Sequence, residues 1–392
     1  MTPTLRKGMA MTAVMMALIG LGWVMVFSTS GAMDLGGEAG RTMFRYLARQ
    51  VVATGLGAAA ILFIIRTPLA DMERWALVVL AGAAVLMLMV FMPGIGHTAG
   101  KATRWIHFGP VSFQPVEVFK LAVVLAYAVL LFRERPNSEW TRETWGKICG
   151  IAGMGLVLPM LQRDFGSTAL LMVIGVIMVW LAGGRLRYLI IAVAVFTALG
   201  VCFICMEEYR IRRIQMYFSF LTGKGGGYQA RQSLIALGAG GFLGVGPGGS
   251  IQKLLYLPSS HADFIFAILG EELGFLGALF TVGAYVFFLR EGVSISRAAT
   301  ARFPALLCAG MTFLIFLQAM WHIAVVLVLV PTKGLALPFV SYGGSSMISS
   351  MMAVGVILRC AREPAATGIV RQAVEPGNRV GDPAGGRAWL PS

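Results

Sequence analysis

Apolar runs recur along nearly the whole of the 392-residue chain, separated by short polar segments. Most of these runs have about 17 to 25 residues, enough to cross a hydrocarbon core about 30 Å thick as an α-helix. Pore-type β-barrels would instead show alternating segments of about ten residues, which this sequence lacks. We interpret these ten runs as membrane-spanning helices: Met9–Ser28, Tyr46–Ile65, Trp75–Met92, Val116–Phe132, Trp145–Leu161, Ser167–Ala182, Tyr188–Cys205, Phe264–Arg290, Phe303–Val330 and Ser345–Leu358. The pattern therefore predicts an all-α, polytopic integral membrane protein.

Composition and charge support this fold class and predict its orientation. The chain is 57% hydrophobic and 13% charged, whereas an ordinary soluble domain has about 25% charged residues. Cytoplasmic loops of membrane proteins are enriched in lysine and arginine. If the ten helices alternate in direction, one side collects Arg6, Lys7, Arg66, Arg74, Arg133, Arg135, Arg185, Arg187, Arg290, Arg297, Arg359 and Arg362. We expect that side to be cytoplasmic, with both termini inside.

We expect a single membrane domain over residues 1–361, because no polar segment is long enough for a core of its own. Residues 206–262, between the seventh and eighth predicted helices, are too long for a simple connector and predict a large extracytoplasmic loop. Gly244, Gly246 and Gly249 in this loop form a G-x-G-x-x-G pattern without a preceding strand. These glycines are more typical of close backbone approach to a ligand or of tight bends. Residues 362–392 predict a disordered cytoplasmic tail.

The outer loops are also basic, against the usual tendency. The net charge is +14. Outer basic residues are Arg49, Lys101, Arg104, Lys120, Arg163, Arg210, Arg212, Arg213, Lys224, Arg231, Lys253 and Lys333. They are either ordinary soluble loop residues or a basic bowl for an anionic substrate, such as a lipid-linked pyrophosphate.

Three carboxylates lie at or within the eighth apolar run. Asp263 and Ser260 fit the S-x-x-D pattern of a capping box, so Asp263 is either a structural cap or a reactive group. In a helix, Asp263 and Glu271 would be about 12 Å apart along the axis. Two carboxyls that flank one glycosidic bond are only about 5 to 9.5 Å apart, so Asp263 and Glu271 cannot be the acid and base at one such bond. Glu271 and Glu272 are either structural, as an ion pair or a protonated carboxyl, or a proton or ion transport site.

Two further polar groups lie at the ends of the apolar runs. Glu117 and Lys120, three residues apart on one helical face, either pair with each other or contact a ligand. Arg210 and Arg213 also share a face and suit either interfacial snorkelling or ligand binding.

Three other positions are less specific on their own. Arg104 is expected in a loop, and Lys333 in the turn VPTKGLALPFVSYGGSS is either an interfacial anchor or a phosphate contact. His322, in an apolar run, predicts a buried packing or hydrogen-bonding residue.

Several long motifs occur in a fixed order: RWIHFGPVSFQPVEVFK, QRDFGST, YRIRR, YQARQS with GGFLGVG, QKLLYLPSSHADFIFAILGEELG and PTKGLALPFVSYGGSS. Together they resemble the SEDS family (shape, elongation, division and sporulation) over nearly the whole chain. The PTKG turn is most similar to the FtsW-type, cell-division branch. The resemblance implies a peptidoglycan glycosyltransferase that polymerises lipid II into glycan strands on the outer face of the bacterial cytoplasmic membrane.

The resemblance also implies partners and site residues. Expected partners are lipid II, the nascent glycan strand, a class B penicillin-binding protein, other division-machinery proteins and membrane lipid, with no nucleic acid. The family's essential aspartate falls on Asp263, which would be the catalytic base of an inverting transfer that releases undecaprenyl pyrophosphate. Expected substrate contacts are Arg49, Arg104, Glu117, Lys120, Arg210, Arg213, Gln229, His261 and Lys333. One departure is Arg163, where the family usually has a proline.

Three points stay open at this stage. A divalent cation, Mg²⁺ or Mn²⁺, held near Asp263 or Glu117 is an option that no ligand spacing indicates. The alternative function is a lipid II flippase that uses Glu271 and Glu272. A non-catalytic scaffold of the division machinery is the third possibility.

Overall fold

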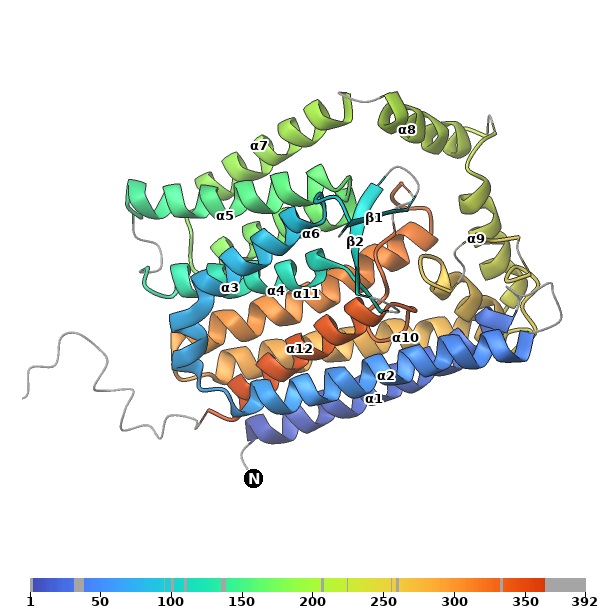
Figure 1. Ribbon diagram of the computed structural model, residues 1–392, viewed down its shortest axis with the longest axis horizontal. Coiled ribbons are helices and arrows are strands. Elements are labelled where there is room, and N and C mark those ends of the chain that lie inside the picture. Colours follow the sequence, from blue (N-terminus) through green and yellow to red (C-terminus); the bar gives the residue numbers. More distant parts are fainter. Residues whose placement is uncertain are drawn as a thin grey trace, which may run out of the picture.

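The computed structural model describes residues 3–31, 39–94, 96–99, 102–108, 111–134, 139–205, 208–223, 225–254, 256–258, 261–331 and 334–363. Its helices are α1 (Pro3–Ser30), α2 (Ala39–Arg66), α3 (Leu69–Met89), α4 (Pro115–Leu131), α5 (Arg142–Leu161), α6 (Phe165–Leu181), α7 (Leu186–Cys205), α8 (Glu208–Leu221), α9 (Tyr228–Gly240), α10 (Ile265–Ala298), α11 (Arg302–Val326) and α12 (Gly344–Ala361). Most of the long helices run lengthwise in Figure 1, whereas α9 stands across one end of the bundle. The predicted disordered tail, apart from its first two residues, lies outside the described residues.

Each of the ten predicted runs falls on a helix, although not all meet the same criterion of length. Among the residues that the structure describes, seven helices are long and apolar enough to cross a membrane: α1, α2, α3, α5, α10, α11 and α12. The apolar helix α6 and the apolar part of α7 are shorter. Helix starts follow local chemistry, since Thr141 and Asp164 accept hydrogen bonds from the backbone amides of Thr144 and Ser167 as N-caps. The multi-pass helical architecture is thus confirmed.

The expectation of an all-α protein is wrong in one respect. A three-stranded antiparallel sheet lies between α3 and α4, with strands β1 (Gly96–Ala99), β2 (Ala102–Phe108) and β3 (Val111–Phe113) in the order β1-β2-β3. The segment is rich in threonine, aromatic and β-branched residues, which favour strands. Ile106 of β2 is fully buried, so the sheet packs onto the bundle. It is too short and too polar to show in a search for membrane-length runs.

The centre of the bundle is formed by α4, α11 and α12. Within the most apolar window of α11 and of α12, 72% of residues are buried, against 22% for α3. Helices α2 and α12 approach closely because Gly355 packs against α2, where a Cβ would lie 3.2 Å from the Cα of Ile61. Small residues allow such close packing between membrane helices.

Helix α10 is broken at Gly274, whose φ of 66° is non-helical. The loop after α9 supplies the hydrogen bonds that the break frees: Val245 N–H donates to the Glu271 carbonyl (3.0 Å), Gly246 N–H to the Glu272 carbonyl (3.1 Å), and Phe275 N–H to the Gly241 carbonyl (2.9 Å). Irregular backbone at membrane depth needs such internal partners. The segment 206–262 is therefore more than a connecting loop, since it contains α8 and α9 and completes α10.

The glycines of this segment serve contacts between protein backbones. Gly244 has a φ of 85°, and a Cβ there would lie 2.1 Å from the carbonyl oxygen of Glu272. Only glycine permits this approach. The close approach of this backbone within the described residues is to α10, and an approach to a ligand stays a prediction.

Candidate active site

Asp263 lies before α10 and does not cap it. The helix begins at Ile265, and its N-cap residue Phe264 forms no side-chain capping bond. The predicted capping box is therefore wrong, because residues 261–264 form a turn that ends before the first helical residue; Ser260 lies outside the described residues. The Asp263 side chain is half-buried. It packs against the backbone of Gly334, where an added Cβ would lie 2.5 Å from its Oδ1 atom.

The turn that carries Asp263 is braced by the segment before α12. Ser341 Oγ donates to the Ala262 carbonyl (2.8 Å) and accepts from the Leu337 amide (2.8 Å). The Tyr342 amide donates to the His261 carbonyl (3.1 Å). The two residues before Asp263 are thus hydrogen-bonded to Ser341 and Tyr342, and the Asp263 side chain packs against Gly334.

Helix α2 holds the same segment from another side. Gln50 is fully buried, and its side chain donates to the Ser341 carbonyl (3.2 Å) and accepts from the Gly343 amide (3.4 Å). One turn earlier, Tyr46 packs its ring against Tyr342, with centroids 4.9 Å apart. Because both contacts come from one face of α2, this helix fixes the position of the turn.

His261 lies between two aromatic rings beside Asp263. Its centroid is 5.8 Å from those of Tyr46 and Tyr342. Its Nδ1 atom is buried and has no hydrogen-bond partner among the described residues. Burial lowers the pKa of the His261 imidazole below its usual range. A neutral ring can accept or donate a hydrogen bond, which suits a substrate contact.

Glu117 and Lys120 pair with each other inside the bundle. Both side chains are buried, and Lys120 Nζ lies 2.9 Å from Glu117 Oε1. Ser349 Oγ donates to the other carboxylate oxygen (2.8 Å). Lys120 also donates to Gln318 Oε1 (2.6 Å). Pairing, one of the two interpretations of their spacing, is confirmed.

Gln318 connects this ion pair to the segment that contacts Asp263. Its amide donates to the Ala336 carbonyl (2.9 Å). One turn along α11, His322 Nδ1 bonds the Leu335 carbonyl (2.7 Å) and the ring is buried, as predicted for a hydrogen-bonding core residue. Helix α11 therefore holds Leu335 and Ala336, which directly follow the Gly334 that packs against Asp263.

The remaining predicted substrate contacts are spread over several elements. Arg49 is exposed on α2, three residues after Tyr46, and forms no hydrogen bond or ion pair with another described residue. Arg104 lies on β2 rather than in a loop, and its guanidinium donates to the carbonyls of Gln162 (3.0 Å) and Arg163. Gln229 is half-buried on α9.

Two further predictions cannot be placed at the level of side chains. Arg210 and Arg213 lie on α8, but their side chains are not among the described parts of the structure. Lys333 lies outside the described residues.

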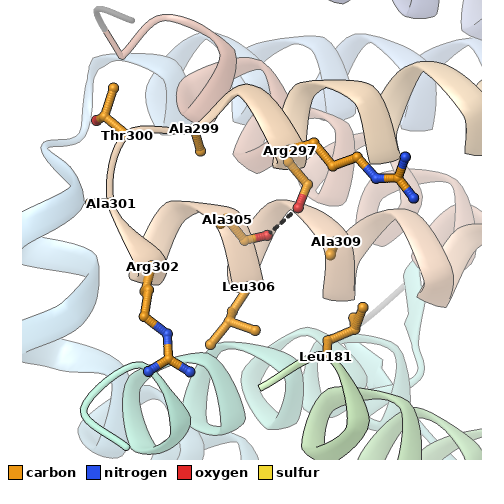
Figure 2. A pocket seen from close by; sticks show the side chains of 10 residues that line it. Leu181, Arg297, Ala299, Thr300, Ala301, Arg302, Ala305, Leu306 and Ala309 are labelled. Atoms are coloured by element: carbon orange, nitrogen blue, oxygen red, sulfur yellow. Dashed lines mark hydrogen bonds between the residues drawn. The ribbon is translucent and has the colours of Figure 1, made fainter. Parts of the chain in front are cut away.

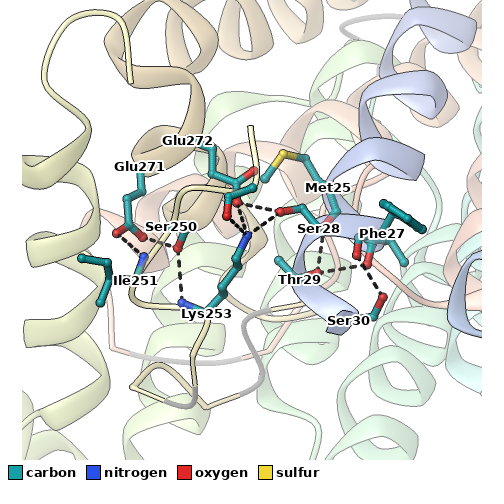
Figure 3. A network of polar contacts seen from close by, with 12 residues as sticks. Met25, Phe27, Ser28, Thr29, Ser30, Ser250, Ile251, Lys253, Glu271 and Glu272 are labelled. Carbon is teal, nitrogen blue, oxygen red and sulfur yellow. Dashed lines mark hydrogen bonds and ion pairs between the residues drawn. The ribbon is translucent and has the colours of Figure 1, made fainter. Parts of the chain in front are cut away.

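Glu271 and Glu272 are structural (Figure 3). Glu271 accepts hydrogen bonds from Ser250 Oγ and from the Ile251 amide (3.0 Å). Glu272 forms an ion pair with Lys253 (2.8 Å) and accepts from Ser28 Oγ (2.6 Å). Both carboxylates are buried and bind the loop before Asp263 onto α10 and α1. These contacts are the structural alternative expected from sequence.

The sequence model of the FtsW, RodA and SpoVE group, described as a cell cycle protein family, matches residues 9–365. The chain belongs to the FtsW/RodA/SpoVE family. Relatives named probable peptidoglycan glycosyltransferase FtsW include that of Halothiobacillus neapolitanus, 36% identical over 90% of this chain and 86% of that protein. The one from Thioalkalivibrio sulfidiphilus is 38% identical over 97% of this chain and 94% of that protein.

Two solved structures share the fold of this chain. A chain from a study of polymerisation and crosslinking by a peptidoglycan synthase complex has a TM-score of 0.73 and 24% identity, covering 90% of this chain and 97% of that chain. The rod shape determining protein RodA of Thermus thermophilus has a TM-score of 0.65 and 22% identity, covering 90% of this chain and 96% of that chain.

A resident metal ion does not fit Glu117, one of the two residues considered for it. Both carboxylate oxygens of Glu117 are used by Lys120 and Ser349. Among the described residues, no group of three or more His, Cys, Asp or Glu is placed to hold a metal ion. We therefore derive no step of the chemistry through a metal.

Several residues around Asp263 were missed by reasoning from the sequence. Gly334 and Ser341 carry no chemical signature, since their importance comes from contacts across the bundle. One signal was present for Gln318: it lies four residues before His322 in an otherwise apolar run, so both polar side chains share a helix face. Such a pair in a membrane helix indicates a polar partner on a neighbouring element.

Proposed function

We propose that this protein is a peptidoglycan glycosyltransferase of the FtsW type. It polymerises lipid II into glycan strands in septal cell-wall synthesis and releases undecaprenyl pyrophosphate. Two findings support this: relatives that cover most of the chain carry that name, and the aspartate of the motif HADFIFA is half-buried and braced.

The proposed topology follows the ten predicted helices. Helices α1 to α7 and α10 to α12 would each cross the bilayer, with α8 and α9 in the extracytoplasmic segment. Both termini would be cytoplasmic, because they lie on the side that collects the basic residues named above for the predicted inner loops. Asp263 would then lie at the outer face of the cytoplasmic membrane.

In the proposed reaction Asp263 is the base. It takes the proton of the acceptor 4-hydroxyl as that oxygen attacks the anomeric carbon of the donor, whose bond to pyrophosphate breaks with inversion. A base must come within hydrogen-bond reach of the proton it removes. The brace of residues 334–342 holds Asp263 in place while the substrate enters, which reduces the freedom lost on reaching the transition state.

Cations stabilise the departing pyrophosphate, which carries most of the developing charge. Arg49 fits this role because its guanidinium has no partner among the described residues. Arg210, Arg213 and Lys333 remain proposed phosphate contacts, and Gln229 and His261 proposed sugar or peptide contacts. Arg104 would contact substrate with the donors left after its two carbonyl bonds. Glu117 and Lys120 would contact the substrate while they remain paired with each other.

The proposed partner is a class B penicillin-binding protein that crosslinks the new strands, together with other division proteins.

One experiment tests the proposed glycosyltransferase activity against the rival function of a lipid II flippase. The purified protein with its transpeptidase partner is given lipid II, and glycan strands are resolved by length for the parent, Asp263→Asn, and the control Asp71→Asn, an exposed carboxylate at the start of α3. Asp263→Asn should abolish strands. Strands of normal length from Asp263→Asn would overturn the assignment, and lipid II movement across liposomes without polymerisation would establish a flippase instead.

A further inference from the structure

A cavity of about 320 Å³ lies at the opposite end of α10 from Asp263. It opens between the C-terminal ends of α10 and α6 and the start of α11 (Figure 2). This is the end that carries the start of α1, because Lys7 hydrogen-bonds Ser294 of α10. An unbroken helix the length of α10 would span about 50 Å, so the cavity is separate from the proposed active site.

Two arginines line this cavity without an ion-pair partner among the described residues. Arg297 is exposed, and Arg302 is half-buried and donates to the carbonyls of Glu134 and Ala182. Neither guanidinium forms an ion pair with any carboxylate of the described residues. The Glu134 carboxylate also attracts the Arg302 guanidinium through space. It forms no ion pair with Arg302 and accepts a hydrogen bond from Thr144 Oγ1, so it compensates this partly buried cation incompletely. An anion in the cavity would complete this compensation through charge-assisted hydrogen bonds.

The start of α11 adds positive potential to the same space. Its N-cap residue, Ala301, lines the cavity and offers no side-chain acceptor to the amides of the first turn. The N-terminus of a helix of 25 residues carries a partial positive charge. Together with the Arg302 guanidinium beside it, and with Arg297 at the other end of the cavity (Figure 2), it gives the cavity a positive potential that favours an anion.

Leu181, Leu306 and Ala309 give the cavity an apolar wall (Figure 2). A charged edge beside an apolar wall matches an amphiphile better than a free anion. Basic pockets between membrane helices on the cytoplasmic side typically bind anionic lipid headgroups. The volume falls in the range of about 300 to 1,000 Å³ that is usual for ligand sites.

We propose that this cavity binds the headgroup of an anionic phospholipid of the inner leaflet. The phosphate lies near the start of α11, between Arg302 and Arg297, and the first methylenes of the acyl chains lie on Leu181 and Leu306. The bound lipid fastens the α10–α11 turn to α6. This site is independent of the chemistry proposed at Asp263.

The test is native mass spectrometry of the purified full chain titrated with phosphatidylglycerol or with phosphatidylcholine. Arg297→Gln should weaken the first phosphatidylglycerol adduct about fivefold, the value expected for one cation near a charged headgroup. Ala305→Leu fills the cavity without changing charge and should weaken the same adduct. Arg290→Gln, an exposed arginine on α10 that does not line the cavity, is the matched control and should leave it unchanged.

Three outcomes would overturn the proposal. Equal binding of phosphatidylcholine would remove the requirement for an anion. Unchanged phosphatidylglycerol binding by Ala305→Leu would assign the effect to general surface charge. Full displacement of phosphatidylglycerol by millimolar inorganic phosphate would indicate a site for free phosphate. None of these readouts depends on glycan synthesis, so their outcome neither supports nor contradicts the proposed enzyme activity.

Discussion

The backbone of Gly334 lies against the carboxylate of Asp263, so closely that a Cβ on Gly334 would come within 2.5 Å of Oδ1. Gly334→Ala should therefore push the Asp263 carboxylate from its position. A displacement of about 1 Å at a reacting group can lower the rate about 100-fold. We expect a loss of that order in kcat for glycan synthesis, with the protein still folded. The control is Gly344→Ala, where the nearest atom to the new Cβ is 3.7 Å away; equal activity of both variants would contradict a role for this contact.

The buried Lys253–Glu272 ion pair should contribute strongly to stability. Glu272→Gln leaves Lys253 buried without its charge partner, which typically costs about 3 to 5 kcal/mol. We expect a large fall in the melting temperature in detergent. Glu143→Gln breaks the exposed Glu143–Lys147 pair and should leave the melting temperature unchanged. Similar melting temperatures for the two variants would show that the buried pair does not hold the loop to α10.

Gln318 should affect turnover without contacting substrate. Gln318→Leu removes an acceptor from Lys120 and a donor from the Ala336 carbonyl, and so loosens the segment that packs against Asp263. We expect kcat to fall about tenfold while KM for lipid II stays near its parent value, because only positioning for the chemical step is lost. Thr312→Val, whose hydroxyl bonds only within α11, is the control. A rise in KM at constant kcat would instead place Gln318 in substrate binding.

His261 should make stability depend on pH. Burial lowers its folded-state pKa below the unfolded value of 6.5, so the unfolded chain binds the proton more readily. The contribution is therefore fully present above pH 6.5 and is lost as the pH falls through the folded-state pKa. Melting temperatures between pH 8 and pH 5 should decline less in His261→Gln than in the parent, and parallel curves would contradict this assignment.

Much of the helical architecture could be predicted from the sequence, because runs such as Phe303–Val330 must be helical to satisfy their backbone in a bilayer. The sheet could not, because strands of three to seven residues leave no membrane-length signal. The break at Gly274 was also missed, since its hydrogen bonds come from Gly241 to Gly246, almost thirty residues earlier.

The candidate site could also be predicted from the sequence only in part. Asp263 could be named from its motif, but its local pattern predicted a helix cap because S-x-x-D is identical in a turn that stops short of the helix. The spacing of Glu117 and Lys120 permitted the pair that the structure contains. The partners Gln318 and Ser349 could not be predicted, because they lie on helices about 200 residues later. Residues that act through tertiary contacts leave little trace in a single sequence.

The central claim is that Asp263 is the base for glycan transfer, and a single-turnover experiment on Asp263→Asn tests it most directly. The variant keeps the shape of the side chain and loses its basicity. With saturating lipid II and the transpeptidase partner present, we expect unchanged lipid II binding and a rate of bond formation lower by about 10² to 10⁴, the usual contribution of a general base. A parental rate, or a loss explained entirely by weaker lipid II binding, would contradict the account.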